Sequence, residues 1–118
     1  STWNVSQVRT IFYMFNNASL FNQPLDTWDI SQIIDMRYMF CAAAQFNQPL
    51  ATWNVSQVAV MRGMFEDASQ FNQPLDTWDV SNIEDMSHML HGASSFNQPL
   101  DSWHVNPVID RQGIFDGT

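Results

Sequence analysis

The protein has 118 residues with 12 acidic side chains, four arginines and no lysine, so its formal net charge at pH 7 is −8. A surface of this sign repels phosphate groups and anionic lipids, which argues against nucleic acid and membranes as partners. The single cysteine, Cys41, excludes an internal disulfide framework, and no apolar run is long enough to span a bilayer.

A repeat of 25 residues organises the whole chain. The sequence Phe-Asn-Gln-Pro-Leu begins at four positions, Phe21, Phe46, Phe71 and Phe96. A tryptophan recurs with the same step at five positions, Trp3, Trp28, Trp53, Trp78 and Trp103. A period of about 20 to 50 residues is typical of arrays whose units bury their apolar faces against one another. We interpret residues 1–118 as one repeat domain cut from a longer array, with units 1–20 (partial), 21–45, 46–70, 71–95 and 96–118 (partial).

The first part of each unit has the pattern of a short strand. In the unit 46–70, apolar Trp53 and Val55 alternate with polar Thr52 and Asn54. One strand per unit predicts a parallel sheet that runs along the array, with neighbouring strands about 4.8 Å apart.

The second part of each unit predicts a short helix. Val58, Met61, Met64, Phe65 and Ala68 are three or four residues apart, a spacing that places them on one helical face. The equivalent residues elsewhere are Ile33, Met36, Met39, Phe40 and Ala43, and Ile83, Met86, Met89, Leu90 and Ala93. Together the two parts predict an α/β array with one short parallel strand and one short helix per repeat.

Two sets of residues are candidates for the helix start. A serine precedes the helical segment in four units and is a candidate N-cap, at Ser6, Ser31, Ser56 and Ser81. Alternatively, an aspartate caps a shorter helix and leaves the residues before it extended, at Asp35, Asp85 and Asp110.

The positions that change from unit to unit lie between the fixed apolar ones. They also recur at spacings of three and four, which would place them on the opposite, solvent-facing side of the helix. We predict that they form the ligand-contact face: Arg9, Phe12, Tyr13, Arg37, Tyr38, Arg62, Glu66, Glu84, His88 and His91.

The fixed apolar positions are the predicted structural core. Each tryptophan shares a strand face with the aliphatic residue after next, so we place the indoles inside rather than on an exposed carbohydrate-stacking surface. The predicted core contains Trp3, Trp28, Trp53, Trp78, Trp103, Phe21, Phe46, Phe71, Phe96, Met36, Met39, Met61, Met64, Met86 and Met89.

An asparagine recurs directly after the phenylalanine of each repeat. Stacked units would align these amides into a ladder that bonds turn backbones, and the alternative is a peptide- or sugar-binding role. The predicted ladder residues are Asn22, Asn47, Asn72 and Asn97.

Acidic side chains recur at two positions of the repeat. They are Asp26, Asp76 and Asp101 before the tryptophan, and Asp29 and Asp79 after it. Neighbouring carboxylates repel one another or hold a hard cation such as calcium, and we favour a solvated acidic face over calcium binding. His88 and His91, with Glu66 one unit earlier, are a weaker candidate for zinc.

The sequence contains no catalytic signature. A nucleophile elbow, a glycine-rich phosphate loop and paired cysteine and histidine positions are all missing, so we predict that the chain is not an enzyme and has no cofactor. Cys41 shares its place in the repeat with Glu66 and His91, which predicts an exposed free thiol.

The full repeat, Phe-Asn-Gln-Pro-Leu-x-x-Trp-x-Val-Ser-x-Val-x-x-Met-x-x-Met-Phe-x-x-Ala, resembles that of the BspA-like leucine-rich-repeat surface proteins. The same kind of repeat occurs in mycoplasma-type and Listeria-type surface lipoproteins. The resemblance covers essentially the whole chain, although Ile11, Arg111 and Ile114 depart from the methionine positions. It implies a right-handed, leucine-rich-repeat-like solenoid on a cell-surface or secreted protein that acts in adhesion.

We therefore predict a non-enzymatic, surface-exposed module for adhesion or for binding a protein or glycan ligand on another cell. The alternative is a structural spacer or stalk in a larger surface protein, for which the variation of the outer residues has no function. End-to-end self-association is a further expectation, because the two ends of an open array expose apolar surface.

Overall fold

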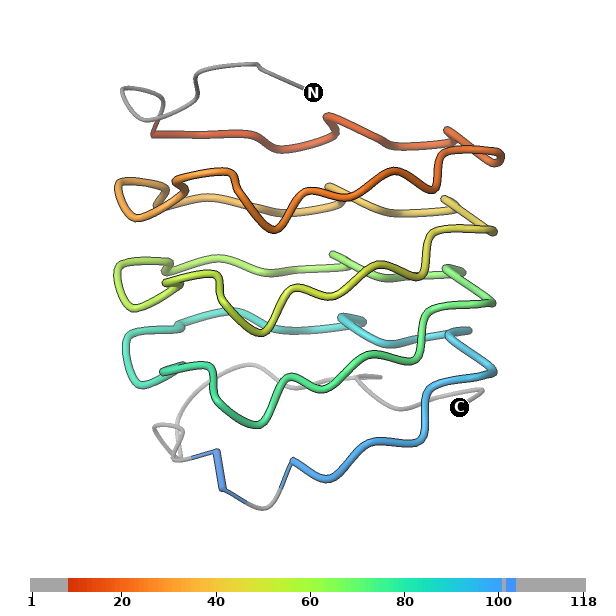
Figure 1. Ribbon diagram of the computed structural model, residues 1–118. Coiled ribbons are helices and arrows are strands. Elements are labelled where there is room, and N and C mark those ends of the chain that lie inside the picture. The colour runs from red at the N-terminus through yellow and green to blue at the C-terminus, as the bar shows by residue number, and fades with distance from the viewer. Residues whose placement is uncertain (1–8, 101, 104–118) are drawn as a thin grey trace.

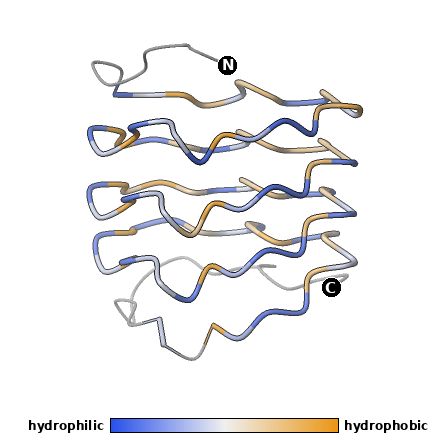
Figure 2. Ribbon diagram, viewed as in Figure 1, coloured by the Kyte–Doolittle hydropathy of each residue, from blue (hydrophilic) through white to orange (hydrophobic). Residues whose placement is uncertain are grey.

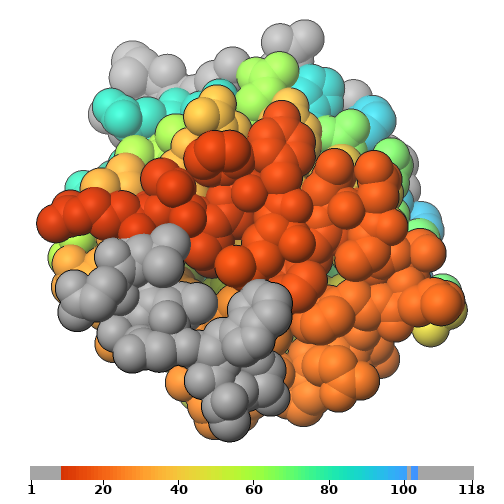
Figure 3. All heavy atoms as spheres, turned by 90° about the horizontal axis from the view of Figure 1, so that it is seen from above, coloured from red at the N-terminus to blue at the C-terminus, as the bar shows by residue number. Residues whose placement is uncertain are grey.

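The computed structural model describes residues 9–100, 102 and 103, in which successive 25-residue units lie side by side as stacked coils (Figure 1). Seen from above, the first described unit covers most of those that follow it (Figure 3). Several residues named in the sequence predictions lie outside the described part of the chain: Trp3, Ser6, Asp101, Asp110, Arg111 and Ile114.

The predicted right-handed α/β solenoid, with one strand and one helix per repeat, is wrong. The described residues contain no helix, and their only strand-like elements are three isolated parallel bridges, Thr10↔Asp35, Asp35↔Val60 and Val60↔Asp85. Residues 52–55 pair with no neighbouring strand, and the bridged residue Val60 lies inside the predicted helix. The serines and aspartates proposed as N-caps therefore have no helix to cap within the described residues.

A run of tight turns replaces the predicted helix. Between Met61 and Ala68, three amides donate to the carbonyl three residues earlier: Met64 to Met61 at 3.1 Å, Glu66 to Gly63 at 3.1 Å and Ala68 to Phe65 at 3.0 Å. The intervening amides donate to the next unit instead: Met61 to Asp85 at 2.8 Å, Gly63 to Ser87 at 2.9 Å, Phe65 to Met89 at 2.8 Å and Asp67 to His91 at 2.7 Å. An α-helix directs every amide along its own axis, so it cannot form these bonds between units.

Left-handed backbone at two positions of each unit makes this alternation possible. Positive φ angles occur at Tyr13, Asn17, Tyr38, Ala42, Gly63, Asp67, His88 and Gly92. Such residues end a helix, and glycine, asparagine and aspartate tolerate the conformation best. Half of the eight residues are of these three types, which was the sequence signal against a helix.

Two columns of stacked phenylalanine rings run through the core. In one column the ring centroids of Phe46 and Phe71 are 6.0 Å apart, and those of Phe71 and Phe96 are 6.1 Å apart. In the other, Phe40 and Phe65 stack at 5.5 Å. Rings from the two columns also pair where one unit leads into the next, with Phe65 and Phe71 at 4.1 Å. The rings therefore join the units into one core, and the apolar positions recur at the same place in each coil (Figure 2).

Tryptophan and methionine side chains fill the rest of the core. Trp53 and Trp78 are each 4% exposed, and Trp28 is 6% exposed. The Trp53 indole nitrogen donates a 2.9 Å hydrogen bond to the carbonyl of Leu25 in the preceding unit, and Trp78 does the same to Leu50. Six methionines of the repeat are almost fully buried: Met36, Met39, Met61, Met64, Met86 and Met89.

The asparagine column forms a hydrogen-bonded ladder on the outside of the coil. The Asn47 side-chain oxygen accepts from the Asn72 amide at 2.9 Å and from the Gln73 side chain at 3.0 Å. Asn22 and Asn72 repeat this arrangement with the units that follow them. The amides bond the backbone of the next turn, and a glutamine is added to the ladder that the sequence predicted.

Reciprocal substitutions at the left-handed positions test the backbone conformation. A Cβ atom on Gly63, at φ +57°, would lie 2.6 Å from Cδ1 of Tyr38, so Gly63→Ala should lower the free energy of unfolding by roughly 1–3 kcal/mol. Ala42, at φ +60°, occupies the place that Gly92 takes two units later, and Ala42→Gly should raise stability by about 0.5–1 kcal/mol. Urea unfolding midpoints measure both changes; equal effects of one sign would contradict the assigned backbone.

Removing one side chain of the asparagine ladder tests its contribution to stability. Asn47→Ala removes the acceptor for Asn72 and Gln73 and should lower the free energy of unfolding by about 0.5–1.5 kcal/mol. The loss is limited because the bonds are exposed and water can partly replace the missing acceptor. Asn47→Asp keeps an acceptor at the same place and should lie closer to the wild type in urea unfolding. Equal losses in the two variants would show that the ladder bonds contribute nothing.

Candidate functional site

A stripe of aromatic and arginine side chains crosses the units on the predicted contact face. The Arg37 guanidinium carbon lies 5.2 Å from the centre of the Phe12 ring, a cation–π contact between neighbouring units. Phe12 meets Tyr13 edge-on at 5.7 Å, and Tyr13 stacks on Tyr38 at 5.2 Å. The turn that begins after each parallel bridge presents these side chains at the same place in successive units.

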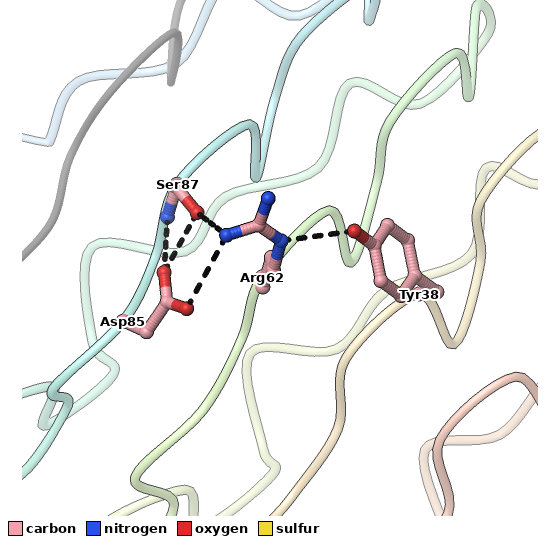
Figure 4. A network of polar contacts seen from close by, with 4 residues as sticks. All are labelled: Tyr38, Arg62, Asp85 and Ser87. Atoms are coloured by element: carbon pink, nitrogen blue, oxygen red, sulfur yellow. Dashed lines mark hydrogen bonds and ion pairs between the residues drawn. The ribbon is translucent and has the colours of Figure 1, made fainter.

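The stripe continues through a polar network around Arg62 (Figure 4). The Arg62 Nε group donates a 2.9 Å hydrogen bond to the Tyr38 hydroxyl, and its Nη1 group donates to Ser87 Oγ at 3.0 Å. The same Nη1 atom lies 3.7 Å from Asp85 Oδ2. Asp85 Oδ1 accepts from the Ser87 amide at 3.0 Å and from its hydroxyl at 2.7 Å. Arg62 therefore joins residues of three consecutive units.

The carboxylates of this face lie deeper than the guanidinium groups they contact. Asp35 binds Arg37 at 3.1 Å, and the Asp35 side chain is 15% exposed whereas that of Arg37 is 46% exposed. The Asp85 and Arg62 side chains are 29% and 42% exposed. Exposed ion pairs of this kind contribute little stability, so their main effect is to orient the arginines. In both ion pairs the guanidinium group is the more exposed partner, and the carboxylate lies nearer the core.

Two carboxylates that build this face were not predicted from the sequence. Asp35 and Asp85, which contact Arg37 and Arg62, were not among the predicted contacts. The available signal was that an aspartate stands two residues before Arg37 and before Ser87, a spacing at which its oxygen can accept the later amide.

The remaining predicted contact residues are spread along the same face. Arg9 and Glu84 occupy one row, joined through backbone bonds from Ile34 to Arg9, Ala59 to Ile34 and Glu84 to Ala59. Both are exposed, and the two intervening units separate them. His88 and His91 meet edge-on with ring centres 5.4 Å apart, and Glu66 lies beside Gly63. The structure therefore groups the aromatic and arginine residues at one end of the face and the histidines at the other.

The acidic and histidine positions provide no metal cluster in the described part of the chain. Within it, no three His, Cys, Asp or Glu side chains are placed to hold one ion. Asp79 Oδ1 instead accepts from the Ser81 amide at 3.1 Å and hydroxyl at 2.6 Å, and Asp29 makes the same pair of bonds to Ser31. These bonds, led by the one from the serine hydroxyl, hold the pKa of both carboxyls below the ordinary value.

Cys41 is a free, half-buried thiol close to two carboxylates. Its burial raises the pKa of the thiol above the ordinary value, and the negative charges of Glu66 and Asp67 raise it further. Since the thiolate is the nucleophile, this environment makes Cys41 a slow one at neutral pH.

Neutralising Glu66 tests the environment of Cys41. Glu66→Gln removes a negative charge that disfavours the thiolate, so the pKa of Cys41 should fall and its reaction with an aromatic disulfide reagent should accelerate at pH 7 to 8. Glu84→Gln removes an equal charge elsewhere on the face and is the matched control. The rate of the Cys41 reaction is measured against pH. An unchanged midpoint of this profile in Glu66→Gln would contradict the assigned contact.

Comparison with known proteins gives one result. The family described as "Mycoplasma protein of unknown function, DUF285" matches residues 1–67 and 21–118, two overlapping stretches that together span the chain. No curated protein and no solved structure matches this chain significantly.

Proposed function

The chain belongs to the Mycoplasma DUF285 family of proteins of unknown function, and on that premise we propose that it is a non-enzymatic, surface-exposed module that binds or adheres to a ligand. The ligand is a protein or glycan on another cell, contacted through the side chains that change from one unit to the next. The proposal keeps the surface role implied by the BspA-like resemblance and discards its helix-and-strand architecture.

The contrast between a uniform interior and a changing outer face carries this proposal. The buried phenylalanine, tryptophan and methionine columns repeat almost unchanged in successive units. In the row of Tyr13, Tyr38, Gly63 and His88 the residue type changes at two of the three steps, although the backbone is left-handed throughout. Tyrosine is a poor choice for that conformation, and strained residues on a surface are typical of functional sites.

The composition of the face also supports binding. Phe12 and Tyr13 are 42% and 49% exposed, and they lie next to Arg37 and Tyr38. Aromatic residues and arginine are enriched among the residues that dominate binding energy at protein interfaces.

No helix in the described residues is long and apolar enough to cross a membrane. Self-association of the arrays end to end stays a prediction.

A structural spacer is the second candidate function. Backbone bonds between units, such as Phe40 to Met64 and Phe65 to Met89, both at 2.8 Å, join the coils in a fixed register that suits a stalk. A spacer requires no ligand, and substitutions on its outer face would have no effect beyond stability.

Glycine substitution of the outer row separates binding from stability. The triple variant Tyr13→Gly, Tyr38→Gly and His88→Gly gives these three positions the residue that Gly63 already provides, so the left-handed backbone is retained. Loss of ring stacking costs about 0.5–1.5 kcal/mol, and relief of backbone strain offsets it. We expect capture on arrays of extracellular proteins and glycans to fall more than tenfold, while the melting temperature changes by only a few degrees.

The control variant carries Asn17→Gly and Ala42→Gly, at the other left-handed position of the repeat. It should keep its capture of every ligand that the wild type binds. A wild-type protein that captures nothing from the arrays would favour the spacer.

A further inference from the structure

One end of the contact face forms an aromatic–arginine patch, made of Phe12, Tyr13, Arg37 and Tyr38, whose side chains contact one another, and of exposed Arg9 and Ile34, whose backbones are joined by a 2.7 Å hydrogen bond. It contains three of the five exposed large hydrophobic residues in the described part of the chain, with Ile34 38% exposed. The patch also holds two of the three arginines in the described part of the chain; the third is Arg62, in the adjoining network. The patch therefore combines apolar contact area with positive charge on a chain of net charge −8.

The positive charge of the patch is directed outward. The Arg37 guanidinium contacts Asp35 through Nη2, at 3.1 Å, and the side chain stays 46% exposed. A guanidinium has five N–H donors, so Arg37 keeps donors for a second acceptor. The ion pairs between described residues do not include Arg9, which is exposed. The patch has two positively charged side chains, Arg9 and Arg37, and one less exposed carboxylate, Asp35, so its net charge is positive.

The patch is also held in place before any ligand arrives. The Arg37 guanidinium lies against the Phe12 ring, and the Tyr38 hydroxyl accepts from Arg62. A side chain that is already ordered loses less entropy on binding. Contacts within the patch also cover ring faces. Tyr38 is covered by Tyr13 on one side, and its ring edge lies close to Gly63.

These contacts disfavour a neutral sugar, which would need free ring faces for stacking. A basic segment would meet Arg9 and Arg37 directly, and like charges at an interface cost affinity. The exposed part of the patch includes much of the Arg37, Phe12, Tyr13 and Ile34 side chains. Carboxylates and aliphatic or aromatic groups complement these surfaces.

We propose that the aromatic–arginine patch binds an acidic peptide segment of a partner protein, whose carboxylates contact Arg37 and Arg9 while its apolar side chains pack on Phe12, Tyr13 and Ile34. The proposal rests on the binding function proposed above and adds the chemical class of the ligand. The binding is through charge-assisted hydrogen bonds around an apolar contact, and no covalent step is involved.

A displayed library of random dodecapeptides, selected on the full chain at about 0.15 M salt, tests this assignment. Enriched peptides should combine Asp or Glu with Leu, Phe or Tyr. The enriched peptides are then synthesised and their binding is measured by fluorescence anisotropy. Arg37→Gln and Arg9→Gln should each raise the dissociation constant at least fivefold, which corresponds to the loss of a single interface contact of about 1 kcal/mol. Circular dichroism and urea midpoints establish that each variant is folded.

Ala51→Asp is the matched control, since it also lowers the net charge by one but lies in the 51–52 turn outside the patch. The equivalent positions already carry Asp26 and Asp76, and the variant should bind within twofold of the wild type. Because Arg9 takes part in no ion pair between described residues, Arg9→Gln remains informative even where Arg37→Gln affects folding.

Three results would overturn the assignment: enrichment of Lys- and Arg-rich peptides, no enrichment at all, or equal binding by the wild type and both arginine variants. A glycan or folded protein that is lost in the triple glycine variant but retained in Arg37→Gln would also overturn it, while leaving the proposed binding function in place. Conversely, arrayed ligands retained in the triple glycine variant would contradict that function.

Discussion

The alternation of amide directions along each coil is the constraint on which the structure depends. Between Gly63 and Ala68, amides that close a local turn alternate with amides that bond the next unit. The local bonds keep each coil compact, and the outward bonds set the register between coils. Because a buried amide without a partner is costly, neither set can be removed while the other is kept. The two left-handed positions per unit serve this alternation, since they reverse the chain direction that would otherwise continue as a helix.

The same register fixes what lies inside and outside the stack. Equivalent residues of successive units lie next to one another, so a phenylalanine repeated in sequence becomes a stacked column in space, as with Phe46, Phe71 and Phe96. Residues between the core positions form parallel rows on the surface. Any side chain placed in such a row meets its counterparts from the neighbouring units. A 25-residue unit can therefore change its outer face without changing its interior.

The outer rows show how variation produces distinct surfaces on one scaffold. At the end near Tyr13 the rows bring rings and guanidinium groups together, whereas at the end near His88 they bring two imidazoles together. The intervening Gly63 leaves space for the Tyr38 ring, so even the absence of a side chain has a consequence in the neighbouring unit. Contacts of this kind couple adjacent units through side chains as well as through the backbone. The proposed binding surface is a property of several units together.

The sequence by itself determined the repeat length, the repeated positions and the division between apolar and changing residues, because these depend only on which residue types recur. It did not determine the secondary structure. Apolar residues at spacings of three and four, as from Val58 to Ala68, fit a helix as well as a run of turns, and the spacing does not encode where each amide bonds. Only the tertiary structure decided that, because four of those amides find their acceptors in the next unit and two in the preceding unit. It also decided the site: Asp35 and Arg37 are close in sequence, but the contact of Arg37 with Phe12 exists only once the units are stacked.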